Sequence, residues 1–140
     1  MYRTLAEAID SFSRGITRSK RSEDRKLGTD YLAALAPLLA RATLGESILR
    51  DLATIDRLFG QTWIIESEPF DEAFEKWRAF KVEYERWAMS GMTVNERLSA
   101  LGLLGAFDEA CRSRDAGNAR ALLLKIHLAE PSIKAIVDQM

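Results

Sequence analysis

Few residues of this chain are of a type that takes part in covalent catalysis. The sequence contains one cysteine, Cys111, and one histidine, His127. Cys111 follows Leu104 and Phe107 at helical spacing, so we expect a thiol on an apolar helix face, where it is an inert part of the core. One cysteine excludes an internal disulfide framework, and one histidine excludes a multi-histidine metal site. We therefore expect no metal and no other cofactor.

The densest set of carboxylates lies between residues 66 and 75. This segment contains five acidic side chains and no basic one: Glu66, Glu68, Asp71, Glu72 and Glu75. Because Glu68/Glu72 and Asp71/Glu75 are four residues apart, each pair shares a helix face and could bind a divalent cation or act as acid and base. We favour a structural role, since carboxylates at a helix N-terminus are stabilised by the helix dipole. Glu68, Asp71, Glu72 and Glu75 are also candidates for contact with a partner.

A set of arginines precedes this acidic segment in the chain. Arg14, Arg18, Arg21 and Arg25 follow one another at spacings of four, three and four residues. On a continuous helix these four side chains would share one face. Such a stripe could bind an acidic protein or phosphate groups, and its alternative interpretation is an ordinary solvated helix face.

The overall charge restricts the kinds of partner. Twenty basic residues face 21 acidic ones, which gives a net charge of −1. Nonspecific affinity for nucleic acid comes from excess positive charge, so nucleic-acid binding is not expected as the main activity. A nucleic-acid-binding regulator that uses the arginine stripe stays open as an alternative.

Arg120 and His127 are a further candidate pair for catalysis. They are seven residues apart, so on one helix they would lie on the same face two turns apart. This spacing resembles the Arg…His motif of HEPN ribonucleases, in which paired arginine and histidine residues across a dimer cleave RNA. Ala121 stands where that family usually has a polar residue. The resemblance implies a ribonuclease as the enzymatic alternative, whereas the structural interpretation of His127 is a helix-end residue bonded to terminal carbonyls.

The hydrophobic pattern predicts helices along the whole chain. One helix is expected over residues 4–19, with a continuation to residue 26 and a break at Gly28. Asp30 is a candidate N-cap for the next helix, and Thr43 to Glu46 matches a capping box before a third. Pro37 lies inside the second pattern, where it kinks the helix or falls in its first turn. Residues 61–67 are the only strand-like segment.

The strongest helical pattern begins at Pro69 and carries a stripe of aromatic residues up to Trp87. After Gly91 we expect shorter helices, capped by Thr93 and Asp115, and a last helix opened by Glu130-Pro131. The sequence thus predicts an all-α fold, an irregular bundle of about seven helices with short connections and no significant sheet. Its modules would be residues 1–90 and residues 91–140, packed together or forming one domain.

Part of the second module resembles a group of bacterial proteins. The segments Asn95-Glu96-Arg97-Leu98, Gly102-Leu103-Leu104 and Phe107-Asp108-Glu109-Ala110 carry the resemblance, which extends over residues 92–139. The similar proteins are small, helical, bacterial and of unknown function. The resemblance implies a bacterial helical module and transfers no catalytic residues.

No targeting signal is evident, since Glu7 interrupts the N-terminal segment before an apolar region develops. No apolar stretch approaches the length of a membrane helix, so we expect a cytoplasmic protein. The sequence favours a non-enzymatic bacterial module that binds another protein, with a toxin-neutralising role of the immunity or antitoxin kind as the specific hypothesis. A homo-oligomer is compatible with these observations.

Overall fold

The computed structural model describes residues 1–140, and all of its regular structure is helical. It contains eight α-helices and one 3-10 helix, η1, and no strand. The predicted all-α class is confirmed, with eight α-helices in place of about seven. The chain forms two compact units, Met1–Tyr84 and Glu85–Met140. The boundary between the two units lies inside a helix, between Tyr84 and Glu85. The sequence predicts it a few residues later, between residues 90 and 91.

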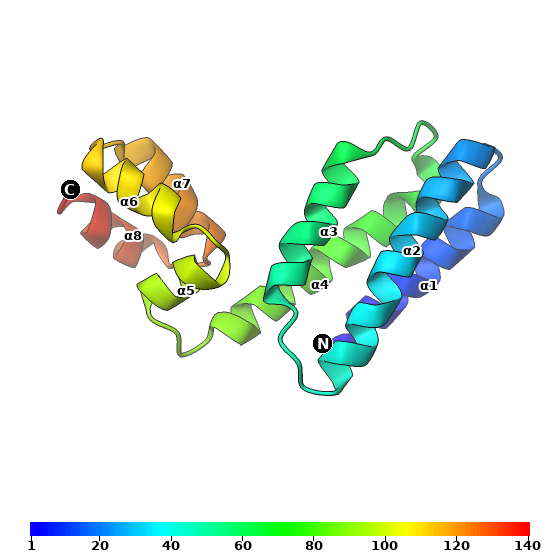
Figure 1. The fold of residues 1–140 in the computed structure, drawn as a ribbon, viewed down its shortest axis with the longest axis horizontal. Helices are drawn as coiled ribbons and strands as arrows, with labels where there is room; N and C mark the ends of the chain where they lie inside the picture. Colours follow the sequence, from blue (N-terminus) through cyan, green and yellow to red (C-terminus); the bar gives the residue numbers. More distant parts are fainter. The chain divides into compact units, whose positions relative to one another are not determined.

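The first unit, Met1–Tyr84, is built from four helices that lie side by side (Figure 1). They are α1 (Tyr2–Arg18), α2 (Ser22–Thr43), α3 (Leu49–Gln61) and α4 (Asp71–Met89), with η1 (Glu68–Phe70) directly before α4. The connection between α1 and α2 and the connection between α3 and α4 lie at the same end of this unit, and the connection between α2 and α3 lies at the other (Figure 1).

Aromatic side chains fill the core of the first unit. Trp77, Phe80 and Tyr84 of the predicted stripe on α4 are buried, whereas Trp87 is exposed. The stripe is thus a core face along most of α4, and its last member is not part of that core. Phe12 from α1 and Tyr31 from α2 contribute rings to the same cluster, edge-to-face with each other and with Phe74 of α4. Such ring pairs stabilise a core beyond the area that they bury.

Two glycines form a slot for an aromatic ring. A Cβ atom on Gly15 or on Gly28 would lie 2.7 Å from the ring of Phe70, so α1 and α2 admit this ring only because both residues lack a side chain. The predicted break at Gly28 is wrong, because α2 runs through it from Ser22 to Thr43. The predicted cap at Asp30 is wrong for the same reason.

One further local prediction, the capping box at Thr43 to Glu46, fails in the first unit. Thr43 does not open a helix; it is the last residue of α2, and its hydroxyl donates to the carbonyl of Ala40 at 2.8 Å. The following helix α3 begins at Leu49, after Ile48 as its N-cap residue, and has no side-chain cap. Pro37 lies well inside α2.

The second unit, Glu85–Met140, contains the end of α4 and four short helices. These are α5 (Val94–Ala100), α6 (Leu104–Arg112), α7 (Ala116–Lys125) and α8 (Glu130–Val137). The predicted caps are confirmed: the Thr93 hydroxyl accepts from the amide of Glu96 at 3.2 Å, and the Asp115 carboxylate accepts from that of Asn118 at 3.0 Å. The core of this unit is mainly aliphatic. None of the helices in either unit is both long and apolar enough to span a bilayer.

Candidate functional site

The arginine stripe is not one helix face. Helix α1 ends at Arg18 and α2 begins at Ser22, so the continuous helix that would align the four side chains does not exist. Arg14 and Arg18 belong to α1, Arg21 precedes α2 as its N-cap residue, and Arg25 lies in its first turns. The side chain of Arg25 donates to the carbonyl of Ser19 at 3.0 Å.

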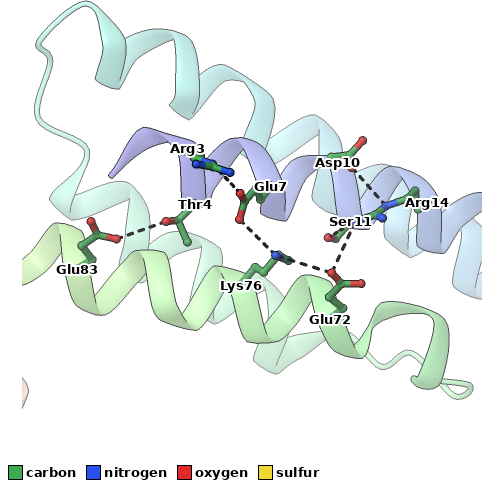
Figure 2. Close-up of polar contacts among 9 residues, drawn as sticks. All are labelled: Arg3, Thr4, Glu7, Asp10, Ser11, Arg14, Glu72, Lys76 and Glu83. Carbon is green, nitrogen blue, oxygen red and sulfur yellow. Dashed lines mark hydrogen bonds and ion pairs between the residues drawn. The ribbon is translucent and has the colours of Figure 1, made fainter.

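The structure brings members of the arginine stripe and of the acidic segment together. Arg18 Nη2 lies 3.2 Å from Glu68 Oε1, and Arg14 Nη2 lies 3.8 Å from Glu72 Oε1 (Figure 2). These exposed pairs contribute little to stability. They do pair four side chains that the sequence predicts to contact a partner.

The rest of the acidic segment forms no metal site. Asp71 and Glu75 are exposed on α4 and have no ion-pair partner in the chain. No group of three or more potential ligands converges in a way that could hold a metal ion. Asp71 and Glu75 therefore remain free to face a partner.

Arg120 and His127 have separate partners. Arg120 forms an ion pair with Glu130, and its hydrogen bond to that carboxylate raises the pKa of the guanidinium. His127 lies beyond the end of α7 with a φ of 60°, and its Nε2 lies 2.7 Å from Oε2 of buried Glu85. Because His127 is outside the helix, the spacing of seven residues does not place it on the face of Arg120.

The structural interpretation of His127 is confirmed for the backbone, since its amide donates to the carbonyl of Leu124 at the end of α7 at 3.1 Å. Its ring instead contacts the Glu85 carboxylate. Cys111, expected to be buried, is partly exposed. The structure therefore assembles no nucleophile with a neighbouring base from these residues.

A different feature, the connection between α3 and η1, has unusual exposure. We call residues 62–67 the Trp63 loop. The side chain of Trp63 is 82% exposed and that of Ile65 is 65% exposed. Two large apolar residues that are exposed in one short segment are candidates for an interaction site.

A buried carboxylate anchors the middle of the Trp63 loop. Asp24, in the first turn of α2, is only 1% exposed. Its Oδ1 accepts from the amide of Ile65 at 3.0 Å, and its Oδ2 accepts from the amide of Glu66 at 2.9 Å. Arg21 Nε lies 3.6 Å from the same Oδ2. Charge-assisted hydrogen bonds of this kind are stronger than those between neutral groups, so Asp24 fixes the backbone that carries Ile65.

Both ends of the Trp63 loop are also held. At the start, the Thr62 hydroxyl donates to the carbonyl of Leu58 at 2.7 Å and contacts the hydroxyl of Tyr31. At the end, the Ser67 carbonyl accepts from the amide of Phe70 at 2.8 Å, and the Phe70 ring occupies the glycine slot. The loop backbone is therefore positioned at three places, while Trp63 and Ile65 are presented to solvent.

The Trp63 loop was not found from the sequence. Its apolar residues, Trp63, Ile64 and Ile65, belong to the segment 61–67 that the sequence predicts to be strand-like, and the structure has no strand there. The decisive partner, Asp24, lies about forty residues earlier in the chain and had no assigned role. The one sequence feature that points to this loop is a tryptophan in a connection that directly follows a helix and precedes an acidic segment.

Comparisons of the chain with protein-family models, with curated proteins and with solved structures found no match.

Proposed function

We propose that this chain is a non-enzymatic module that binds another protein through the Trp63 loop. The observation that supports this proposal is the combination of high exposure at Trp63 and Ile65 with a backbone anchored by buried Asp24. Exposure alone is common for single apolar residues. An anchored loop that presents two of them is a more specific arrangement.

The physical advantage of the anchor concerns the entropy of binding. A flexible loop loses conformational freedom when a partner orders it, and this loss weakens the complex. The Trp63 loop is already ordered by its contacts with α2, so little of this loss remains. Tryptophan is also among the residues that contribute most to protein interfaces. Burial of Trp63 and Ile65 by a partner would make the main favourable contribution to the free energy of binding.

The acidic residues predicted to contact a partner, Glu68, Asp71, Glu72 and Glu75, follow directly after the Trp63 loop in the chain. Glu68 and Glu72 are already paired with Arg18 and Arg14, so they offer less to a partner than Asp71 and Glu75. Rim charges of this kind chiefly set association rate and specificity. We assign most of the binding free energy to Trp63 and Ile65. Asp71 and Glu75 would mainly affect the rate at which the partner associates.

The specific function that we propose is toxin neutralisation by a bacterial protein of the immunity or antitoxin kind. Such a protein works by covering a surface of its target, so it needs a preorganised interface and no catalytic groups. The anchored backbone and the exposed Trp63 and Ile65 support this proposal.

The test compares partner recovery by three forms of the chain. The parent, the Trp63→Ala variant and the Leu44→Ala variant are used to capture proteins from cells of the native host. Leu44 is a matched control, because it is 80% exposed and lies in the connection between α2 and α3. We expect a protein that the parent and Leu44→Ala recover and that Trp63→Ala loses. Equal recovery by all three forms would contradict the role of the loop.

The specific function has its own test. The captured partner is expressed alone and together with the chain. Growth arrest by the partner, relieved by the parent and not by Trp63→Ala, is the expected result. A partner that is harmless on its own would contradict toxin neutralisation and leave protein binding intact.

A further inference from the structure

The end of the first unit that carries the Trp63 loop also carries unpaired charges of both signs. Glu66 belongs to the loop, and Lys20 belongs to the turn between α1 and α2. Both side chains are exposed, and neither has an ion-pair partner in its own chain.

The turn and the loop are neighbours in the structure. Asp24 accepts from the loop amides and also pairs with Arg21, the residue that follows Lys20. A second link joins Arg18 at the end of α1 to Glu68 just beyond the loop. One surface therefore combines an exposed apolar pair, a free cation and a free carboxylate.

This combination is complementary to itself. In a dimer with two-fold symmetry the same patch is used by both copies, so each residue of one copy faces a different residue of the other. We propose that a second copy of this chain covers the Trp63 loop. Trp63 and Ile65 pack against those of the other copy near the symmetry axis, and Lys20 of each copy faces Glu66 of the other. A second copy brings both signs of charge to the same apolar pair.

The same features determine how strong the dimer is. Only two large apolar side chains per copy are available, so the interface belongs to the small class that buries less than about 1,200 Å² in total and exchanges readily. Its ion pairs are exposed and weaken as salt rises. A dimer of this kind shields the apolar loop and still releases it when a tighter partner arrives. The inference uses the loop of the proposed function but does not depend on the identity of that partner.

The test is sedimentation velocity over a concentration series. We expect a concentration-dependent rise from monomer to dimer for the parent, with a dimer dissociation constant on the order of 10–100 μM, as suits a small interface. Trp63→Ala should raise this constant at least about tenfold, which corresponds to about 1.4 kcal/mol. The matched variant Leu44→Ala should associate like the parent, because exposed Leu44 belongs to the connection between α2 and α3, which lies at the other end of the unit (Figure 1).

A charge exchange tests the two-fold geometry directly. Lys20→Glu and Glu66→Lys should each remain monomeric alone, because both cross-copy pairs become like-charged. A mixture of these two variants should form a dimer again, because both pairs are then opposite in charge. Both substitutions change exposed side chains, and circular dichroism checks that each variant keeps its helices.

Several results would overturn the proposal. A parent that stays monomeric up to about millimolar concentration would do so, and so would a dimer that Trp63→Ala leaves unchanged. Failure of the mixed variants to associate would reject the pairing of Lys20 with Glu66. Binding of a monomeric parent to phosphatidylcholine vesicles, lost in Trp63→Ala, would assign the loop to a lipid surface instead. None of these outcomes decides whether a foreign protein is captured, so the two proposals can fail separately.

Discussion

The two units of the chain obtain their helices in different ways. The first unit has long helices, and α1, α2 and α3 have no side-chain cap. The second unit has short helices, and Thr93 and Asp115 cap two of them. Isolated short helices are only marginally stable in water, so a cap contributes a large fraction of their stability. Long helices with a broad buried face are stabilised by packing, and they form without a side-chain cap.

The largest expected effect tests whether packing dominates the first unit. Trp77→Ala removes a buried indole and its hydrogen bond from Nε1 to Asp56 Oδ1, which is 2.9 Å long. We expect a loss of about 3–5 kcal/mol in the free energy of unfolding, measured by urea denaturation. A variant with cooperative unfolding near the parent midpoint would show that the aromatic core is not what stabilises this unit.

The glycine slot offers a comparison within one type of substitution. Gly28→Ala places a methyl group 2.7 Å from the Phe70 ring, and we expect a loss of about 1–3 kcal/mol from overpacking. Gly60→Ala is the matched control, because Gly60 lies in α3 with nothing within 4 Å of the added carbon. There the change should stabilise by about 0.5–1 kcal/mol through helix propensity. Equal effects at the two sites would contradict the slot.

Caps are expected to matter only in the second unit. Thr93→Ala and Asp115→Ala each remove a bond to a first-turn amide, and each should cost about 1 kcal/mol. Thr43→Ala in the first unit should change stability by less than about 0.5 kcal/mol, because Thr43 ends a helix and caps none. Thermal unfolding followed by circular dichroism measures all three. A cost at Thr43 equal to that at Thr93 would remove the distinction between the units.

The smallest expected effect concerns surface pairs of the first unit. The hydrogen bond from Lys76, aided by Arg3, holds the pKa of the Glu7 carboxyl below its ordinary value (Figure 2). Because the pKa is lowered on folding, this stabilisation is present above the ordinary carboxyl pKa and is lost as the pH falls through the folded value. Glu7→Gln should therefore reduce the difference in urea midpoint between about pH 7 and about pH 3 by a small amount. An unchanged difference would show that the pair contributes nothing.

The contrast between the units also explains which features could be read from the sequence. The caps at Thr93 and Asp115 were predicted because each depends on residues within one helical turn. The break at Gly28 was predicted wrongly because a glycine that ends a helix and a glycine that admits a distant ring look alike along the chain. Phe70 lies about forty residues from Gly28, and no local pattern connects them.

The same reasoning applies to the candidate site. The stripe of Arg14 and Arg18 was expected to continue to Arg25 because helical spacing alone does not reveal a turn at residues 19–21. The pairing of Arg18 with Glu68 and the anchoring of Glu66 by Asp24 depend on tertiary structure. The sequence shows that these charged groups are present, but it does not show that Arg14 pairs with Glu72 and Arg18 with Glu68.

Asp24 separates the shape of the Trp63 loop from the surface that the loop presents. The anchor acts through the backbone amides of residues 65 and 66, which every amino acid other than proline supplies. Substitutions at Trp63, Ile65 and Glu66 can therefore alter what is recognised while the loop keeps its conformation. A lineage carrying this scaffold could track a changing partner by replacing a few exposed side chains, with little loss of folding stability at each step.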